Sequence, residues 1–382
     1  MTLIRLPDDP IDNAKPTLTP PIGLWSIREC IHGTRVVDLN VEDPDTITDD
    51  IVGYSLHFPS QERHLRAVRE FVTAKTEILG GPHGGLMKVD GVESYYGPGE
   101  TYFLGKDVGF ADLPYPRFSE EEMLPYWSEA KPFGLSPKTD RWMPVEFSRG
   151  CPNACRFCAM PSFWGKWQAK PLPVVASYLM WLSNRHEVRE IIVLDDNISA
   201  DRHYFMSMLG LFANHGITWS APNGIYARTL LDPQVIVGLS RSHCHSISLP
   251  FETGCEASAE AMGIGKKRFT FGEAHMLVDW LKAEGIKTTG FFIIGYPGET
   301  EHDVKETLAF ANALPLDARH IYFATPYRGT KLHEVCTVNN YIVHDERTAT
   351  YKTPVISTPW LSRERLLELW KEDHDAALRR KA

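Results

Sequence analysis

Three cysteines at short spacing are the residues of this sequence with the clearest capacity for chemistry. They are Cys151, Cys155 and Cys158, in the stretch Glu146-Phe-Ser-Arg-Gly-Cys-Pro-Asn-Ala-Cys-Arg-Phe-Cys158. A strand-like segment ends just before them, so a short loop can wrap all three thiolates around one metal centre. Three thiolates on a four-iron cluster leave one iron without a protein ligand, whereas an electron-transfer cluster normally takes four cysteines. The spacing therefore predicts a [4Fe–4S] cluster with an open iron that binds a reactant.

Zinc is the competing metal for these cysteines. A structural zinc site needs four tetrahedral ligands, and the candidates for the fourth, His83, His215 and Cys244, are all distant in the sequence. A non-catalytic iron–sulfur or zinc-binding protein is thus the alternative to an enzyme. The other four of the seven cysteines are scattered, which does not suggest a disulfide framework.

Strand-like and helix-like segments alternate after Trp142, which predicts parallel strands joined by crossover helices. Six strands are expected, at 144–147, 190–194, 217–221, 245–251, 287–294 and 320–323. Helix starts agree with this pattern, because Thr270 and Thr300 each precede an acidic residue by three positions and Asp232 precedes a proline. The segment 362–380 is expected to form a terminal amphipathic helix.

The first part of the chain differs from the rest, with strands expected at 34–39, 51–56 and 76–79 and a helix at 60–73. The predicted class is therefore α/β: a partial (β/α)6 TIM-like barrel preceded by a small Rossmann-like α/β domain, with a C-terminal helical tail. The expected domains are 1–110 for the Rossmann-like part, 111–138 for a linker, 139–330 for the barrel and 331–382 for the extension.

Composition sets further limits on the function. The 382 residues are 43% apolar and 23% charged, as in soluble globular proteins. The longest apolar runs, such as 291–294, are far shorter than the roughly 20 residues that cross a bilayer, so no membrane span is expected. The N-terminus lacks the features of a secretory signal, which predicts a cytoplasmic location. The net charge of −9 leaves extended nucleic-acid binding unsupported.

The cysteine stretch resembles the radical S-adenosylmethionine superfamily, whose C-x3-C-x2-C signature follows the first barrel strand and commonly has an aromatic residue, here Phe157, before the last cysteine. Four later segments fall where the later strands of that family end: 193–197, 251–254, 290–300 and 325–330. The resemblance implies that S-adenosylmethionine binds the open iron and is cleaved reductively to methionine and a 5′-deoxyadenosyl radical, which abstracts hydrogen from a substrate. It also implies a flavodoxin- or ferredoxin-type reductant.

The same resemblance implies residues that contact S-adenosylmethionine. Phe157 would lie against the adenine, and Asp195 or Asp196 would accept hydrogen bonds from the methionine ammonium. These two aspartates replace the Gly-Gly-Glu that is frequent in the family. Cys255 either donates a hydrogen atom to a product radical or packs as a small buried residue, and the sequence favours packing.

Further contacts are expected at later strands. Glu252 ends the fourth strand among apolar neighbours, where a carboxylate needs a partner such as ribose hydroxyls or the ammonium; a salt-bridged rim glutamate is the alternative. Arg228 is expected to pair with a carboxylate of the substrate or of methionine, with a surface ion pair as the alternative. Phe292, Ile294 and Gly295 are expected to form an apolar wall and backbone contacts at the adenine, or else an ordinary buried strand.

Five N-terminal segments resemble, in order, the cobalamin-binding domain attached to many radical S-adenosylmethionine enzymes: 20–25, 35–40, 50–55, 80–83 and 97–100. The sequence has no Asp-x-His-x-x-Gly there, the motif that supplies a histidine to cobalt, so cobalamin binding stays open and the domain is either functional or degenerate. His57 and His83 are the candidate contacts. A cobalamin-dependent methyltransferase and a radical isomerase or mutase are both compatible, with a small-molecule, nucleotide or peptide substrate.

Overall fold

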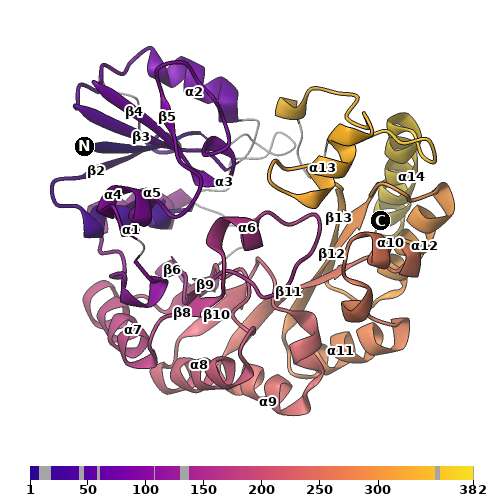
Figure 1. Cartoon of the computed structure of the whole chain (residues 1–382). Helices are drawn as coiled ribbons and strands as arrows, with labels where there is room; N and C mark the ends of the chain where they lie inside the picture. Colours follow the sequence, from indigo (N-terminus) through magenta and orange to yellow (C-terminus); the bar gives the residue numbers. More distant parts are fainter. Residues whose placement is uncertain are drawn as a thin grey trace. The chain divides into compact units, whose positions relative to one another are not determined.

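The structure is a computed structural model that describes residues 1–7, 19–42, 47–57, 61–106, 108–129, 137–348 and 353–381. Within these residues it contains two parallel β-sheets and one antiparallel hairpin, with helices in the connections (Figure 1). The predicted α/β class is confirmed. Residues 130–136 of the expected linker and Ser60, the expected start of a helix, lie outside the described residues.

The N-terminal sheet is entirely parallel, with the strand order β2-β1-β3-β4-β5. Its strands are β1 (Thr2–Arg5), β2 (Arg35–Asp38), β3 (Ile51–Ser55), β4 (Thr76–Gly80) and β5 (Glu93–Ser94). The helices of this part are α1 (Ile22–Cys30), α2 (Glu62–Arg69), α3 (Gly81–Gly84), α4 (Gly99–Leu104) and α5 (Glu120–Glu129). The expected strands β2, β3 and β4 and the helix α2 are present, which confirms the Rossmann-like domain.

Strand β1 was not predicted, yet it lies inside the sheet and pairs with both β2 and β3. Its residue Ile4 is fully buried and packs in one apolar cluster with Val52 of β3 and Leu79 of β4. Leu65 and Val68 of α2 join the same cluster, which is why their helical spacing faces the sheet. The apolar alternation of four residues is too short to identify β1 from the sequence.

The second sheet has six strands in the order β13-β12-β11-β10-β9-β6, the sheet of a partial (β/α)6 barrel. Its strands are β6 (Trp142–Val145), β9 (Glu190–Val193), β10 (Thr218–Ala221), β11 (Cys244–Glu252), β12 (Lys287–Ile294) and β13 (Ala318–Phe323). All six expected strands are present within about two residues of their predicted bounds. A short hairpin of β7 (Ser148–Arg149) and β8 (Gln168–Ala169) follows β6 and was not predicted.

Helices follow the strands of this sheet, as crossover connections require. They are α6 (Met160–Trp164), α7 (Leu172–His186), α8 (Arg202–His215), α9 (Pro233–Arg241), α10 (Glu256–Ala261), α11 (Phe271–Ala283), α12 (Glu301–Ala313), α13 (Lys331–Val338) and α14 (Arg363–Lys381). Capping boxes begin α11 at Thr270 and α12 at Thr300, and the Asp232 side chain caps α9. The helix starts read from the sequence are therefore confirmed.

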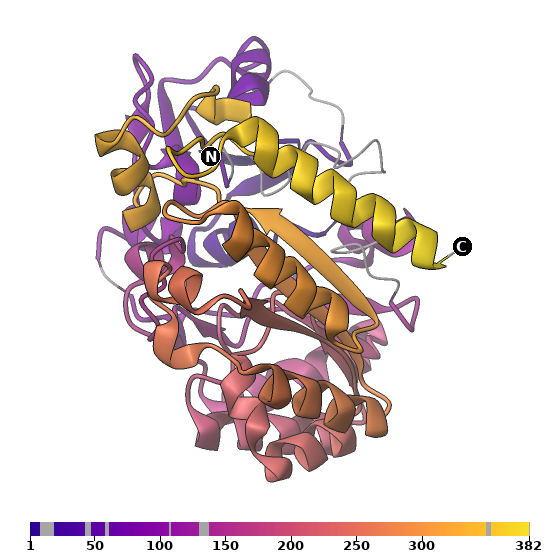
Figure 2. The same ribbon diagram turned by 90° about the vertical axis from the view of Figure 1, so that its right-hand side faces the viewer.

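The terminal helix α14 lies beside α12 and β13 (Figure 2). Leu366 and Leu369 are buried in one cluster with Phe323 of β13. Arg365 binds both carboxylate oxygens of Glu301 at the start of α12, at 2.9 and 2.8 Å. The predicted helical tail is thus an integral layer on the last strands rather than a separate segment.

The described residues form two compact units whose boundary differs from the expected domain boundary. One unit comprises 1–152, 160–196 and 211–222, and the other comprises 153–159, 197–210 and 223–382. The first unit contains both the Rossmann-like sheet and the strands β6, β9 and β10. Within this unit, Tyr115 stacks on Tyr178 of α7 at 4.1 Å between ring centroids.

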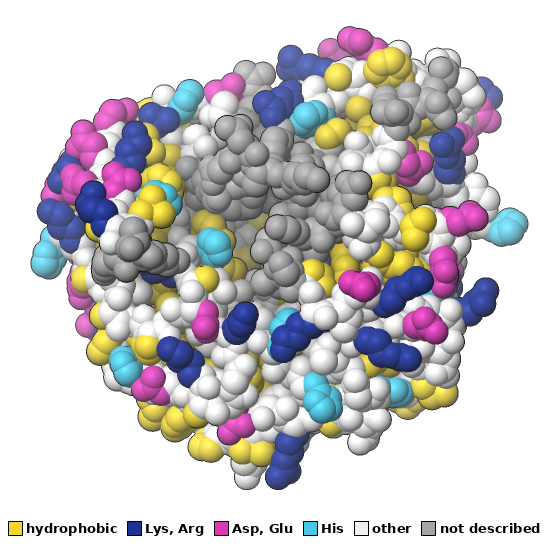
Figure 3. Space-filling view, turned by 180° about the vertical axis from the view of Figure 1, so that it is seen from behind, with side chains coloured by type: hydrophobic (Ala, Val, Ile, Leu, Met, Phe, Trp, Pro, Cys, Tyr) yellow, Lys and Arg dark blue, Asp and Glu magenta, His cyan; other side chains and the backbone are white. Residues whose placement is uncertain are grey.

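No helix in the described ranges is long and apolar enough to span a membrane. Figure 3 shows acidic and basic side chains interspersed over the face that it draws, without a continuous basic stripe in that view.

Candidate metal and cofactor site

The three cysteines lie in a loop that starts just after β6 and is closed by the β7–β8 hairpin. Because β7 pairs with β8, residues 150–167 form one closed loop that also contains α6. Gly150, directly before Cys151, has a φ of +81°. A Cβ atom at this position would lie 3.0 Å from the carbonyl oxygen of Lys166, at the other end of the loop. A glycine is therefore needed where the two ends of the loop approach each other.

Asp195 and Asp196 fix the chain that leads into this loop. Asp195 is 1% exposed, and its two oxygens accept hydrogen bonds from the Phe147 N–H at 2.8 Å and from the Ser148 hydroxyl. Asp196 accepts a hydrogen bond from the Gly150 N–H at 2.9 Å. Burial raises the pKa of Asp195 well above its ordinary range, while these hydrogen bonds oppose that rise.

These contacts change the expected role of one aspartate. Both oxygens of Asp195 are occupied by the chain itself, so the expected bond to a methionine ammonium has no support at this residue. Its role in the structure is to position the entry to the cysteine loop. Only one oxygen of Asp196 accepts a hydrogen bond, from the Gly150 N–H. Of the two aspartates, Asp196 therefore stays the predicted acceptor for the methionine ammonium.

The middle of the loop is held by backbone hydrogen bonds and apolar packing. The N–H of Arg156 donates to the carbonyl of Met262, and its carbonyl accepts from the N–H of Leu332, each at 2.9 Å. Cys155 and Phe157 pack against a buried cluster that includes Met262 and Leu332. Phe157 is only partly buried, which is compatible with a contact with adenine.

The donor set of the loop fits an iron–sulfur cluster. Cys151, Cys155 and Cys158 form no disulfide and have half-buried side chains, and the Cys158 N–H donates a hydrogen bond to the Cys155 carbonyl at 3.2 Å. The other four cysteines belong to other segments, so the loop offers three thiolates and no fourth. Thiolates are the usual ligands of such clusters, and partial exposure leaves access for a further, non-protein ligand.

Glu252 stands out at the end of β11. The pairing of β11 with β12 shifts between Pro250 and Glu252, and Glu252 adopts a φ of +64°. Within the described part of the chain its carboxylate has no hydrogen bond or ion pair, and burial alone raises its pKa from 4.5 to about 8. A left-handed non-glycine residue costs about 1–2 kcal/mol, and an unpaired, half-buried carboxylate adds to that cost. Such a residue indicates a binding site.

Side chains alternate between the two faces of β12, and Phe292 and Ile294 lie on the buried face rather than on the accessible one. Both are 0% exposed, with Phe292 6.2 Å from the ring of Phe310 on α12 and Ile294 in the cluster beneath α14. Their neighbours Phe291 and Ile293 are partly exposed and, by the period of two, lie on the other face. On this strand, Phe291 and Ile293 are therefore better placed than Phe292 and Ile294 to form the apolar wall against the adenine. Each lies one residue before the position expected from the sequence.

Gly295 has a structural reason to be glycine. Its φ is +80°, and a Cβ atom would lie 2.4 Å from Leu366 of α14. Its N–H donates to Glu299 at 2.6 Å, as does the N–H of Tyr296 at 2.9 Å. Glu299 is 3% exposed and burial raises its pKa to about 7. The backbone N–H that was expected at the adenine is thus engaged by Glu299, a residue that the sequence did not single out.

Arg228 is part of an ion pair, which was the alternative reading of this residue. Its guanidinium lies 3.0 Å from Glu273 and donates to the carbonyl of Arg268 at 3.1 Å. It also covers the ring of Phe269 at 5.2 Å from the centroid. The bond from Arg228 contributes most to a pKa of about 2 at Glu273. The expected contact with a ligand carboxylate therefore has no support in these contacts.

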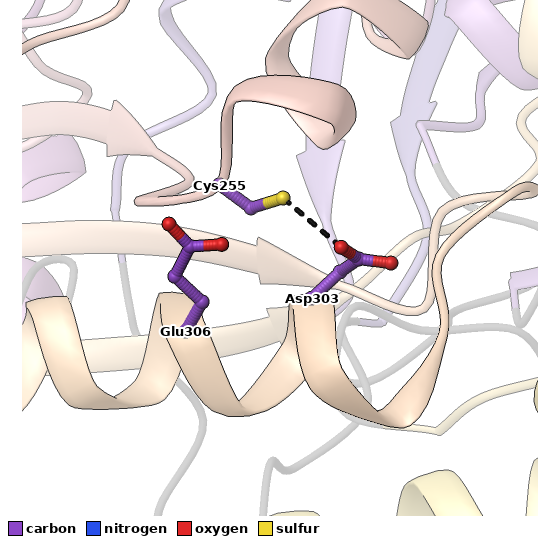
Figure 4. A group of neighbouring side chains, drawn as sticks. All are labelled: Cys255, Asp303 and Glu306. Atoms are coloured by element: carbon purple, nitrogen blue, oxygen red, sulfur yellow. Dashed lines mark hydrogen bonds between the residues drawn. The ribbon is translucent and has the colours of Figure 1, made fainter.

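Cys255 lies beside two acidic residues of α12, and Figure 4 shows the three side chains together. One ligand atom from each of Cys255, Asp303 and Glu306 lies within 4.8 Å of the others. The thiol donates to Asp303 at 3.3 Å, and the other oxygen of Asp303 caps α12 through Thr300. Burial raises the pKa of the thiol. A buried, protonated and hydrogen-bonded cysteine agrees with the packing role that the sequence favours.

The N-terminal sheet has the order of flavodoxin-like folds, whose ligands bind where the strand order reverses, here between β1 and β3. Close to that edge, a Cβ atom on Gly81 would lie 2.4 Å from the carbonyl oxygen of Leu56. His83 is 4% exposed and its Nε2 lies 2.8 Å from Glu62. The architecture fits a corrinoid, but His83 is engaged by Glu62 and is not a free ligand for cobalt.

Residues 145–311 match the Radical SAM superfamily. An uncharacterised methyltransferase of Pyrococcus horikoshii is 27% identical over 265 residues, which cover 68% of this chain and 54% of that protein. The cytidylyl-2-hydroxyethylphosphonate methyltransferase of Streptomyces wedmorensis is 25% identical over 260 residues, covering 65% of this chain and 48% of that protein. The chain thus spans about half the length of these relatives.

Two solved structures share the fold at low sequence identity. The radical S-adenosylmethionine methyltransferase TsrM of Kitasatospora setae, with cobalamin and a [4Fe–4S] cluster bound, aligns with a TM-score of 0.64 and 14% identity, covering 90% of this chain and 79% of that one. The cobalamin-dependent radical enzyme OxsB aligns with a TM-score of 0.58 and 13% identity, covering 98% and 61%. Residues 145–311, which include the cysteine loop after β6, thus form a domain similar to the Radical SAM superfamily, and the chain shares its fold with two radical S-adenosylmethionine enzymes whose solved structures hold cobalamin.

Proposed function

We propose that this protein is an enzyme that reductively cleaves S-adenosylmethionine and uses the resulting radical for hydrogen abstraction and C–H functionalisation of an organic substrate. The observation that carries the proposal is the placement of Cys151, Cys155 and Cys158 in one loop that follows the first barrel strand. The match to the radical S-adenosylmethionine superfamily over 145–311 supports it.

The protein's own residues would bind and orient the reactants. The three cysteines would hold a [4Fe–4S] cluster, which when bound supplies one electron to the sulfonium and leaves one iron open for the amino and carboxylate groups of S-adenosylmethionine. Asp195 keeps the entry to the loop in place through Phe147 and Ser148. Phe157, with Phe291 and Ile293 of β12, would enclose the adenine and exclude water.

Glu252 would contribute the polar contact to S-adenosylmethionine. Its carboxylate is the unpaired acidic group at the end of β11, and burial holds its pKa near 8. Ribose hydroxyls or the methionine ammonium would supply the hydrogen bonds that the described part of the chain does not, and a bound cation would also favour the charged form of the carboxylate. Binding would therefore relieve a cost that is present in the free protein.

Methylation is the reaction class that the N-terminal domain favours over rearrangement. The strand order β2-β1-β3-β4-β5 is compatible with a corrinoid at the edge between β1 and β3, and cobalamin, when bound, would carry the methyl group. Because His83 is engaged by Glu62, cobalt would be bound without this histidine. The substrate would be a small molecule, a nucleotide or a peptide, and a flavodoxin or ferredoxin would supply the electron. A reducing compartment such as the cytoplasm suits cysteines that form no disulfides.

The test is formation of 5′-deoxyadenosine by the anaerobically reconstituted and chemically reduced protein. We expect the product with the natural sequence, and a fall to background with Cys155→Ala, which also loses its iron because one of three cluster ligands is removed. Cys244→Ala makes the same truncation at the buried start of β11 and should retain both iron and product. Product formation by Cys155→Ala, or one bound zinc ion in place of iron, would contradict the proposal. A tightly bound corrinoid absorbance separates methylation from rearrangement.

A further inference from the structure

A group of four charged residues, three of them buried and the fourth half-buried, lies at the base of the cysteine loop and has no part in the proposed chemistry. Arg149, in β7, is 6% exposed and stands two residues before Cys151. Its Nε donates to Glu146 at 2.7 Å and its Nη1 donates to Glu100 at 3.0 Å. Lys170, which follows β8, is 2% exposed and completes the group. The two cations and two carboxylates balance each other, as buried charges require.

One aromatic ring holds the two cations in place. The ring centroid of Phe110 lies 4.6 Å from the Arg149 guanidinium and 4.3 Å from the Lys170 ammonium. The ring centroid of Trp164 in α6 also lies 4.6 Å from the Arg149 guanidinium. Gln168 fixes the ring through a hydrogen bond from the Phe110 N–H at 2.8 Å. Arg149 is therefore restrained by two carboxylates and by two aromatic rings.

Glu100 reaches this group from the N-terminal domain. It is 3% exposed in the first turn of α4, and α4 packs directly on α1. A Cβ atom on Gly99 would lie 2.5 Å from Ile27 of α1, so the two helices are in close contact at this point. The packing of the Rossmann-like domain thus sets the position of the Glu100 carboxylate. Because Arg149 bonds to this carboxylate, the same packing also restrains Arg149 at the base of the loop.

We propose that Arg149 is a positioning residue that fixes the start of the cluster loop against the N-terminal domain, with Glu100 as its essential partner. Two residues of extended chain span at most about 7 Å, so a shift of the Arg149 backbone is transmitted directly to Cys151. The Glu146 contact is local to the strand and loop, whereas the Glu100 contact is the one that spans 49 residues of sequence. The effect of Arg149 on catalysis rests on the proposed function, but its role in positioning the loop does not.

The first test is hydrogen exchange of the metal-free, full-length protein, which needs no cluster. We expect Glu100→Gln and Arg149→Gln each to speed exchange in 147–169 by about tenfold, because removing one partner of a buried ion pair leaves the other uncompensated. The double variant should exchange no faster than the faster single variant, since both changes break the same contact. Glu77→Gln is the matched control, because Glu77 pairs with Arg69 at 2.8 Å elsewhere in the N-terminal domain.

Two further measurements keep the proposal open to refutation. Glu100→Asp retains the charge and shortens the side chain, so it should also speed exchange in 147–169 even if the glutamine variant fails to fold. In the reconstituted protein, Glu100→Gln should release iron to a chelator about tenfold faster than Glu77→Gln and broaden the electron paramagnetic resonance signal of the reduced cluster. Exchange in 147–169 that matches the Glu77→Gln control, or additive effects in the double variant, would overturn the inference. Absence of a cluster in the natural sequence would refute the proposed function alone.

Discussion

Replacing Glu252 by glutamine should stabilise the protein and weaken its binding of S-adenosylmethionine. Burial raises the pKa of this carboxyl from 4.5 to about 8, with no opposing partner in the described chain. The difference corresponds to about 3–5 kcal/mol against folding once the group is ionised, the lower figure allowing for its partial exposure. Glutamine has the shape of the protonated acid and never ionises, so it removes that cost.

The sign of the pH dependence follows from the raised pKa. Below about pH 4.5 the carboxyl is protonated in both the folded and unfolded states, and the two proteins should have similar stability. As the pH rises towards about 8, the unfolded state of the natural protein releases its proton first, so the natural protein loses stability and the glutamine variant does not. The advantage of the variant should therefore grow between these two values and level off above them.

The assay is urea unfolding of the metal-free protein at pH 5 and pH 9, for both forms. The free energy of unfolding of Glu252→Gln should exceed that of the natural protein by about 3–5 kcal/mol more at pH 9 than at pH 5. Glu256→Gln, in a side chain that is 80% exposed, should change stability by no more than about 0.5 kcal/mol. A variant that gains nothing at pH 9, or that binds S-adenosylmethionine as tightly as the natural protein, would refute the role given to Glu252.

Two predictions test the packing around β12. Gly295→Ala should cost about 2–4 kcal/mol, because a Cβ atom would lie 2.4 Å from Leu366 at a φ of +80°; Gly285→Ala, at a φ of +73° but with no atom within 4 Å, should cost about 1 kcal/mol in the same urea titration. Phe292→Ala should cost about 3–5 kcal/mol as a core truncation, whereas Phe291→Ala should cost clearly less and weaken binding of S-adenosylmethionine instead. The reverse order of the two phenylalanine variants would contradict the face assignment.

The barrel strands could be read from the sequence because each is a buried apolar run followed by a helix with its own start signal. The capping residues Thr270 and Thr300 behave as the local chemistry predicts. Strand β1 could not be found in the same way, because four residues carry too little periodicity, and only pairing on both sides gives it its place. The β7–β8 hairpin is shorter still, and its existence depends on contacts between residues about 20 apart in sequence.

In the candidate site too, some features follow from residues close together in the sequence, and others depend on contacts that only the folded chain makes. The cysteine spacing is local, and it predicts the cluster loop without a structure. The role of Asp195 is tertiary, because its partners Phe147 and Ser148 are 48 and 47 residues away. The face on which Phe292 lies depends on where α12 and α14 pack, which an apolar run of this kind does not encode. Arg149 and Glu100 are likewise joined only by the fold.

The most direct test of the central claim is electron paramagnetic resonance of the reconstituted and reduced protein, with and without S-adenosylmethionine. If Cys151, Cys155 and Cys158 leave one iron open, the spectrum should be that of a [4Fe–4S] cluster, and added S-adenosylmethionine should shift its g-values by binding that iron. A spectrum that is unchanged by S-adenosylmethionine, or a protein that binds one tetrahedral metal ion in place of a cluster, would contradict the account.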